Sequence, residues 1–596
     1  MHPKKPEHPA ISFPPDKSLA LCIIAGNVEG YIKRFVESFQ KLTPHIFVVR
    51  AVGNQTPDRT LEIAQAMGCQ INVYYNAAEH ADWPHVDDFG RARQMAFEMG
   101  MQGGHQLLMW ADTDDCIDPE SVREIHALIR EQEFDCLYLP YRLSNNNLAP
   151  VRERIVRAGT FRWQDPIHES LTAVIESPRY LRAAAAEVTH MPGTHRHDRP
   201  NERNVRILES LRKEDGSLLP RWCFYLCQEY EVQGRQEEAI RTALEGVRGW
   251  QANRGLLQNC EAYELYVMLA RWGSDPQAKL ALLREAWAIE PWRREAVALM
   301  AGAYADMGNA KECLALARMT VSLPEPNERP WTHRSSIYRW GGIYLYTMAM
   351  RMNGMNSEAD TLEEQMFRQS GSLISIIHPT LGRPEKAARV RSLFLERAKH
   401  PERVEYIFAY SADDRESAAI LSRFRHVETP APEDPERPTT VANANAAYAK
   451  STGQIVIFAA DDVEPPFWWD EGIVEQIGDP GQPAVLEVGD GHRKDGLLAH
   501  PVFTRSVPEL LGLPKGEMFS SEYEHLFFDT EYTFRARKAR LVRPSTVTFL
   551  HHHPLHEPVE FDATYARGNN DATYARSEAT YRRRNPDAYG PEDLTA

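Results

Sequence analysis

The sequence predicts an α/β protein in which two halves of alternating strands and helices flank an all-α region. Short apolar runs alternate with stretches of helical spacing up to about residue 200, and this alternation restarts near residue 369. Between the two halves, helix-forming residues recur with a period of 3.6. We therefore expect domains at 19–200, 201–368 and 369–558, with extensions at 1–18 and 559–596.

Strands that are apolar throughout indicate a parallel sheet covered on both faces. In the first half such strands are expected at 19–25, 46–49, 71–75 and 106–111, with helices at 29–40, 60–67 and 89–99. In the second half they are expected at 373–377, 404–410, 454–460, 484–488 and 541–550, with helices at 384–398, 442–451 and 530–539. Active sites in such sheets lie at the carboxyl ends of the strands.

The central region contains an internal repeat with the offsets of a tetratricopeptide motif. The first copy is Leu226, Tyr230, Gly234, Ala239 and Ala243, and the second is Met300, Tyr304, Gly308, Cys313 and Ala317. In such repeats glycine ends the first helix and small residues let the second approach closely. The repeats predict a docking surface for a protein partner; a plain helical linker is the alternative.

Composition excludes several classes of protein. The net charge of −16 argues against a protein with an overall basic surface that binds nucleic acid. No apolar run is long enough to span a bilayer, and the N-terminal residues do not resemble a secretory signal. The eight cysteines form no CxxC pair, so we expect buried thiols in a reducing cytoplasm. Cys223 and Cys227, four residues apart, are interpreted as small buried side chains; a metal site is the alternative.

Two acidic clusters follow corresponding strands of the two halves. Residues 110–115 read WADTDD, and residues 458–463 read FAADDV. Crowded carboxylates repel one another and are costly to desolvate, which a divalent cation such as Mn²⁺ or Mg²⁺ would offset. A polar turn that caps a helix is the alternative for either cluster alone. Their repetition at equivalent places favours metal binding.

The first half resembles family 2 glycosyltransferases, which have the Rossmann-like GT-A fold of nucleotide-diphospho-sugar transferases. The resemblance rests on LCIIAGNVE at 21–29, the helix end ESF at 37–39, TPDRT at 56–60, DFGRAR at 88–93, the DxD motif at 112–114, IHE at 167–169 and His190. The repeat region fits a subgroup of this family that carries a tetratricopeptide tail. The resemblance covers residues 19–200.

The second half looks like another such domain, from residue 373 to about 556. Asp461 and Asp462 align with Asp114 and Asp115, and FDTEYTFR at 528–535 resembles the acidic helix start that carries the catalytic base. A histidine run at 551–553 closes a strand, where a metal ligand is expected; a solvated cluster is the alternative. Because side chains alternate along a strand, His551 and His553 would share a face.

The resemblance implies a role for each of these residues. The bases would be Asp529 and, by default, Glu169; donor contacts would come from Asp112, Arg93, Asp413 and Asp461; and metal ligands would be Asp114, Asp115, His190, Asp461, Asp462, His551 and His553. The chain departs from the family pattern at two positions. Arg50 stands near the place of an aspartate that usually contacts the uracil base, and Ala459 stands in place of the leading Asp of the DxD motif. Arg93 would either reach a phosphate or pair with Asp88.

These features predict a metal-dependent, inverting glycosyltransferase that moves a sugar from a nucleotide-sugar donor to an acceptor hydroxyl, with two active sites. In an alternative, one half is catalytic and the other, with the repeats, binds the acceptor or a protein. A third reading is a nucleotidyltransferase on a similar fold. The acceptor would be a glycan, a protein or a modified nucleobase, and we expect no membrane. The final repeats, DATYAR at 562 and 571 and EATYRR at 578, show no apolar face and read as a surface extension.

Overall fold

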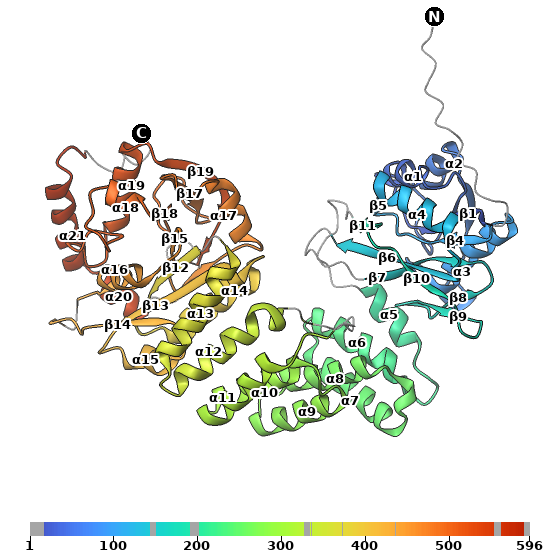
Figure 1. Cartoon of the computed structure of the whole chain (residues 1–596), viewed down its shortest axis with the longest axis horizontal. Coiled ribbons are helices and arrows are strands. Elements are labelled where there is room, and N and C mark those ends of the chain that lie inside the picture. Colours follow the sequence, from blue (N-terminus) through green and yellow to red (C-terminus); the bar gives the residue numbers. More distant parts are fainter. Residues whose placement is uncertain are drawn as a thin grey trace, which may run out of the picture. The chain divides into compact units, whose positions relative to one another are not determined.

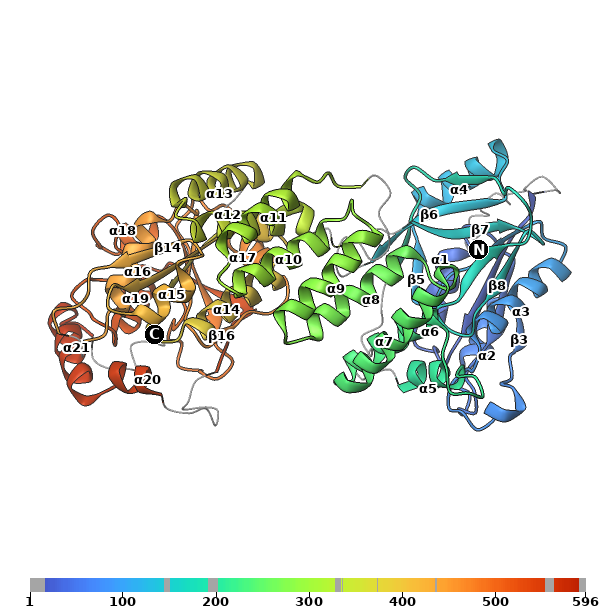
Figure 2. The same ribbon diagram turned by 90° about the horizontal axis from the view of Figure 1, so that it is seen from below.

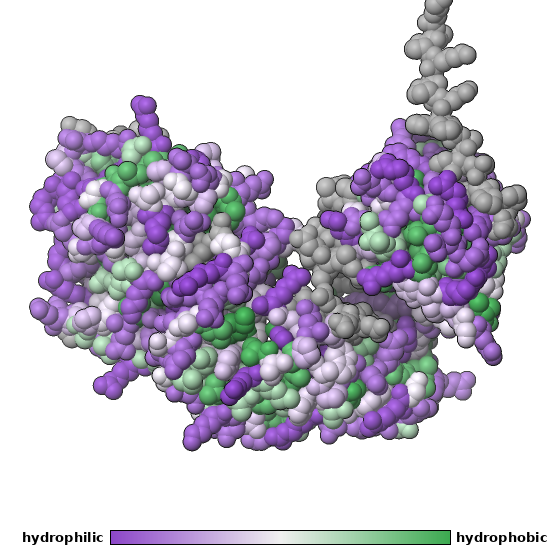
Figure 3. All heavy atoms as spheres, in the orientation of Figure 1, coloured by the Kyte–Doolittle hydropathy of each residue, from purple (hydrophilic) through white to green (hydrophobic). Residues whose placement is uncertain are grey.

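The computed structural model describes residues 17–143, 151–190, 202–326, 334, 336–371, 374–434, 437–552 and 562–588. The chain divides into two compact units, Met1–Trp272 and Gly273–Ala596 (Figure 1). The division runs through the helical region, so each unit combines an α/β part with helices. Hydrophilic side chains cover most of the surface that Figure 3 shows, in keeping with the net charge of −16. Among the described residues, no helix has the length and apolar character needed to cross a membrane.

Unit 1 is built on one mixed sheet with the order β3-β2-β1-β4-β7-β6-β11-β5, and β10 also pairs with β6. Strands β1 to β4 are parallel, β7 runs antiparallel to β4 and β6, and β11 is parallel to β6. The strands are β1 (Leu19–Ala25), β2 (Ile46–Arg50), β3 (Gln70–Val73), β4 (Leu107–Met109), β5 (Asp115–Ile117), β6 (Cys136–Leu143), β7 (Val151–Arg157), β10 (Tyr180–Arg182) and β11 (Val188–His190), with a separate hairpin of β8 (Phe161–Gln164) and β9 (Ser170–Ala173).

Helices cover both faces of this sheet, as the apolar strands predict. Leu21 and Ile23 of β1 pack in one cluster with α1 (Ile32–Phe39) and α4 (Pro119–Glu131). Ala20 and Cys22, on the opposite face, pack with α3 (Phe89–Gln102) and β8. Helix α2 (Thr60–Ala66) follows β2. The alternation along β1 therefore buries both of its faces.

Unit 2 repeats this topology. Its sheet has the order β14-β13-β12-β15-β18-β17-β19, with the same sequence of parallel and antiparallel neighbours. The strands are β12 (Ile374–Pro379), β13 (Val404–Ser411), β14 (His426–Thr429), β15 (Ile455–Phe458), β17 (Val485–Gly489), β18 (Val502–Thr504) and β19 (Val542–Thr548). The helices around it are α14 (Pro384–Arg397), α15 (Arg415–Leu421), α16 (Thr440–Lys450), α17 (Trp469–Ile477), α18 (Val507–Leu510) and α19 (Phe528–Lys538). The two halves predicted from sequence therefore share one strand order.

The predicted repeat signature lies on two helix pairs. Gly234 joins α6 (Pro220–Val232) to α7 (Gln236–Ala252), and Gly308 joins α10 (Arg294–Asp306) to α11 (Ala310–Ser322). Both glycines have a positive φ, 72° and 73°, which only glycine adopts at low cost. The other helices are α5 (Glu202–Ser210), α8 (Asn259–Trp272), α9 (Pro276–Ile289), α12 (Gly342–Met352) and α13 (Asn356–Ser370). Within unit 2, α10 to α13 lie side by side (Figure 2).

Small side chains of the repeat are buried between the paired helices, as the motif predicts. Ala239, Ala243, Cys313 and Ala317 are all fully buried. Cys223 is buried as well, and burial raises its pKa to about 12. A thiol held in its protonated form does not ligate a metal readily, which agrees with its reading as a small buried side chain.

The C-terminal residues are not the loose surface extension that their composition predicts. They form α20 (Ala563–Gly568) and α21 (Asp571–Arg584). Tyr581 is 8% exposed and packs in a core cluster of unit 2, and Thr573 and Ser577 are buried beside it on the same helix. These three side chains lie on one side of the helix, and Arg584 adds an ion pair with Glu531, so the helix docks although a pattern of apolar residues is missing.

Gly90 is packed closely against a neighbouring backbone segment, and this predicts a measurable effect of its replacement on stability. A Cβ on Gly90 of α3 would lie 2.4 Å from the backbone oxygen of Asp165, so Gly90→Ala forces backbone movement. We expect a loss of about 1–3 kcal/mol in the free energy of unfolding. Gly30→Ala is the control, because a Cβ there meets nothing within 4 Å. Equal urea midpoints for the two variants would contradict this packing.

Candidate functional site

In unit 1 the acidic cluster lies in the turn between β4 and β5, at the carboxyl end of the parallel strands. Asp115 is fully buried. Its carboxylate accepts hydrogen bonds from the backbone N–H of Asp112 (2.9 Å), the hydroxyl of Tyr141 (2.9 Å) and the guanidinium of Arg154 (3.3 Å). Arg154 is also buried, so a matched buried ion pair fixes the shape of the turn.

Three predicted metal ligands meet at this turn. One ligand atom each from Asp114, Asp115 and His190 lie within 4.8 Å of one another, the only such group of three found among the described residues. The antiparallel pairing of β5 and β11 places Asp115 opposite His190, whose Nδ1 is 3.5 Å from Asp114 Oδ1 and 3.6 Å from Asp115 Oδ1. Burial raises the pKa of Asp114, and Asp112 and Asp115 add to the rise. A bound cation would offset that repulsion.

Arg93 pairs with two of the predicted site residues and not with Asp88. Its guanidinium donates to Asp112 and to Glu169, at 2.7 Å each. Asp88 instead caps the N-terminus of α3 by accepting from the backbone N–H of Arg91. Burial lowers the pKa of Arg93, but the two carboxylates outweigh it and the net shift is upward. Glu169, the base expected by default, is therefore held in an ion pair with Arg93 through its Oε1.

A cavity of about 270 Å³ lies beside Asp112 and Arg93, at the carboxyl ends of β1 and β2. Part of its lining comes from the motifs quoted above, namely Ile24, Ala25, Gly26, Asn27, Phe89 and Thr113. The sequence did not single out the rest, which are Ala51, Val52, Gln55, His85, Val86 and Arg203. Arg50 ends β2 but does not line the cavity. The side-chain amide of Asn27 donates to the backbone oxygen of Thr56 at 3.0 Å, and that of Gln55 donates to the backbone oxygen of Pro84.

The strand register of unit 2 corrects the predicted alignment of the two acidic clusters by one residue. The backbone N–H of Trp110 donates to Arg154, and that of Phe458 donates to Pro501, which places Trp110 and Phe458 at equivalent positions. In unit 2 a small sheet of β16 (Val463–Glu464) and β20 (Leu550–His551) pairs His551 with Val463. This pairing corresponds to that of His190 with Asp115 in unit 1.

Asp462 therefore stands in the place of Asp114, and the residue that replaces the leading Asp of the motif is Ala460, not Ala459. The equivalent of Asp115 is the apolar Val463. An ungapped alignment of WADTDD with FAADDV gives the same match, whereas the predicted alignment paired the two Asp-Asp dipeptides with each other.

Asp462 and His551 form the counterpart of the Asp114–His190 pair. Asp462 Oδ1 is 3.2 Å from His551 Nε2. Burial opposes ionisation of Asp462, but the hydrogen bond and charge of His551 outweigh it and lower its pKa to about 2. Asp461 turns away from this pair, because its carboxylate bonds to the buried His378, which in turn contacts the hydroxyl of Tyr406.

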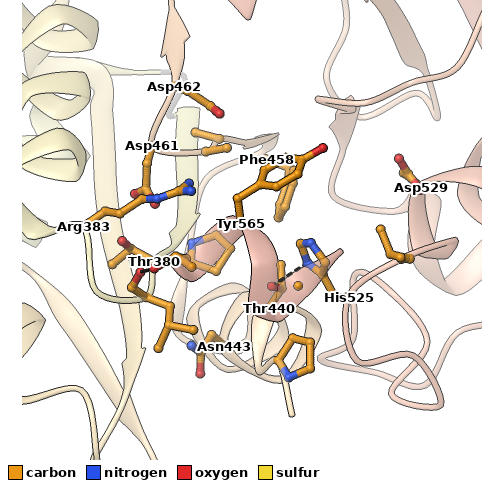
Figure 4. Close-up of a pocket in the computed structure, with 18 of the residues that line it drawn as sticks. Thr380, Arg383, Thr440, Asn443, Phe458, Asp461, Asp462, His525, Asp529 and Tyr565 are labelled. Atoms are coloured by element: carbon orange, nitrogen blue, oxygen red, sulfur yellow. Dashed lines mark hydrogen bonds between the residues drawn. The ribbon is translucent and has the colours of Figure 1, made fainter. Parts of the chain in front are cut away.

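Asp529, the predicted base, lines a cavity of about 260 Å³ together with Asp461 and Asp462 (Figure 4). Burial raises its pKa, against a hydrogen bond from the backbone of Thr530 and the charge of Arg493. A carboxylate at the start of a helix with a raised pKa is suited to accept a proton. Asp413, by contrast, is exposed and is not in the lining, and His553 lies outside the described residues.

Several polar side chains of this cavity were missed by the sequence reading. His500 is 6% exposed, and neither ring nitrogen has a hydrogen-bond partner among the described residues. Burial lowers its pKa to about 3, so the ring is neutral. Arg383 and Tyr565 also line the cavity, and they come from segments 182 residues apart. Only a local glycine-arginine-proline sequence at 382–384 could have drawn attention to Arg383.

No protein-family model matches the chain, and no curated protein matches it. Among solved structures, S. aureus TarS overlaps with 46% of this chain and 53% of its own, at 13% identity and a TM-score of 0.25. TarS 1–349 overlaps with 60% of this chain and 92% of its own, at 11% identity and a TM-score of 0.25. The MamA protein overlaps with 28% of this chain and 80% of its own, at 16% identity and a TM-score of 0.22. Overlaps at TM-scores this low do not establish a shared fold or activity.

Proposed function

We propose that this protein is a metal-dependent glycosyltransferase that uses a nucleotide-sugar donor on GT-A-like units. The observation that carries the proposal is the convergence of Asp114, Asp115 and His190 at the carboxyl end of the unit 1 sheet, beside a cavity. Ligands of open α/β sheets bind at this edge. The resemblance of residues 19–200 to family 2 glycosyltransferases supports the same assignment.

The residues of unit 1 fit a divalent cation. Two carboxylates supply hard oxygen donors, which suit Mn²⁺ or Mg²⁺, and the imidazole adds a borderline nitrogen donor. A cation held there would supply positive charge to the diphosphate of a nucleotide-sugar. Tyr141, whose hydroxyl contacts both Asp115 and His190, would hold these two ligands in orientation.

The protein's own groups account for the remaining steps of an inverting transfer. In unit 1, Arg93 bridges Asp112 and Glu169 at the edge of the cavity, where it holds both carboxylates in place. In unit 2, Asp529 would take the proton from an acceptor hydroxyl, since burial has raised its pKa. Attack on the face of the sugar opposite the diphosphate inverts its configuration.

A second candidate function follows from the differences between the units. Val463 and Ala460 remove two carboxylates from unit 2, and Asp461 is engaged by His378. These differences favour unit 2 as a module that binds a nucleotide-sugar or the acceptor without transferring the sugar. Against it stands Asp529, which lines the unit 2 cavity and whose pKa is raised by burial.

The direct test is an assay of nucleotide-sugar hydrolysis and transfer with a panel of donors. We expect turnover with Mn²⁺ or Mg²⁺ and its loss on adding EDTA, restored by excess metal. Product analysis separates the classes, because a nucleotidyltransferase transfers the nucleotide and a glycosyltransferase the sugar. Undiminished turnover in EDTA would refute metal dependence.

A further inference from the structure

We propose that Arg383 is the anion-binding group of the unit 2 cavity, and that Asp562 of the C-terminal helices holds its place until the diphosphate of a ligand displaces it. This inference rests on the proposed use of a nucleotide-sugar, and it identifies how the second cavity would recognise the diphosphate. It also gives a role to the first DATYAR repeat, which the sequence leaves unexplained.

Arg383 lies where a diphosphate would need a cation. It ends the loop between β12 and α14 and lines the cavity with Asp461 and Asp462. Figure 4 shows its guanidinium close to Asp461, and the negative charges of both carboxylates act to raise its pKa, although burial opposes this. A planar guanidinium binds carboxylate and phosphate oxygens in the same bidentate way.

The present counter-ion of Arg383 comes from a distant part of the chain. Asp562 accepts two hydrogen bonds from the guanidinium, with 2.7 Å between Nε and Oδ2. Lys386 Nζ lies 3.5 Å from the same carboxylate, so one anion is held by two cations. Asp562 also caps α20 by accepting from the backbone N–H of Tyr565. The carboxylate thus occupies a place that suits a phosphate group.

Helix α20 forms a wall of the cavity through polar contacts. The hydroxyl of Thr564 donates to the backbone oxygen of Leu381 at 3.0 Å, and Tyr565 faces the carboxylates (Figure 4). Thr564, Tyr565, Gly568 and Asn569 all belong to the lining. Helix α21 is anchored separately, by the buried Tyr581 and by the ion pair of Arg584 with Glu531. Release of Asp562 therefore does not require α21 to leave the core.

The negative charge around Arg383 indicates that its ion pair with Asp562 can be exchanged for a bound anion. The negative charges of Asp461, Asp462 and Asp562 all act on Arg383, and Lys386 is the other cation beside Asp562. A diphosphate that entered while Asp562 remained would add negative charge to this group. When the diphosphate takes the place of Asp562, Arg383 keeps an anionic partner. Repulsion between the diphosphate and the carboxylate of Asp562 favours this exchange.

The test is calorimetric titration of the full-length chain with inorganic pyrophosphate and Mn²⁺, in an Asp114→Ala background that silences unit 1. Asp562→Asn removes the charge but keeps the N-cap. We expect it to tighten pyrophosphate binding about tenfold, and Arg383→Gln to weaken it at least tenfold. Asp571→Asn is the matched control, since Asp571 is the exposed aspartate of the next repeat, and we expect no change.

Hydrogen exchange gives a second readout. Pyrophosphate should increase amide exchange in residues 562–570 of the Asp114→Ala chain and leave 577–584 protected. Unchanged or weakened binding in Asp562→Asn, with circular dichroism unaltered, would overturn the inference, as would tightening in Asp571→Asn. If no nucleotide-sugar is turned over but pyrophosphate follows the expected pattern, the proposed function fails and this inference stands.

Discussion

Replacement of Asp114 by alanine is expected to lower the rate of sugar transfer on the order of 100-fold or more. Asp114 is the partly exposed carboxylate of the ligand group in unit 1, whereas Asp115 is buried and held by Tyr141 and Arg154. Its loss removes one of three ligands without opening a buried ion pair. The measurement is the initial rate of transfer, together with Mn²⁺ binding followed by electron paramagnetic resonance.

Glu120→Ala is the control for this variant, because Glu120 is exposed on α4 and keeps the net charge change the same. We expect it to transfer sugar at the wild-type rate. If Asp114→Ala keeps full activity and Asp462→Ala loses it, the catalytic cation belongs to unit 2. Full activity in both variants would refute the metal assignment altogether.

In an Asp114→Ala background, which leaves transfer to unit 2, replacement of Asp529 by asparagine is expected to lower the remaining kcat about 10²–10⁴-fold, the range typical of a lost general base. The carboxylate must be ionised to accept a proton, so wild-type activity should fall as pH drops through the pKa of Asp529. Burial places that pKa above its ordinary value, which moves the acidic limb of the pH profile toward neutral pH. In Asp529→Asn this limb should disappear.

The control for Asp529→Asn is Glu509→Gln, on an exposed turn of α18 in the same unit. It should leave both kcat and the pH profile unchanged. If Asp529→Asn retains wild-type kcat while its affinity for the donor or acceptor falls, then Asp529 contributes to binding, and unit 2 is the acceptor-binding module.

Patterns along the chain predicted the layout of the fold because burial imposes a period. Apolar spacing placed β1 to β4 of unit 1, β12, β13, β15, β17 and β19 of unit 2, and the helix pairs of the repeat, whereas the other strands of the two sheets were not predicted from it. Gly234 and Gly308 were placed by the turn they must form. The C-terminal helices were misjudged, because α21 docks through Tyr581 and small polar residues. Small polar side chains can be buried in a helix interface, but they leave no hydrophobic pattern in the sequence.

The candidate site was predicted in part. Asp114, Asp115 and His190 were named from the sequence and are brought together, because the ends of neighbouring strands must meet at one edge of a sheet. The partners of Arg93 and the turn of Asp461 toward His378 were not predictable. They depend on which side chain of another element lies within about 3 Å, and sequence spacing carries no such information.

The sequence by itself determined the strand and helix pattern, the two acidic clusters and the helical repeat, since each follows from local spacing and burial. Only the tertiary structure decided that Asp115 lies opposite His190 on a paired strand, and that Asp562 reaches Arg383 across 179 residues. The register of paired strands and the docking of a terminal helix are set by long-range contacts, and the local sequence does not record them.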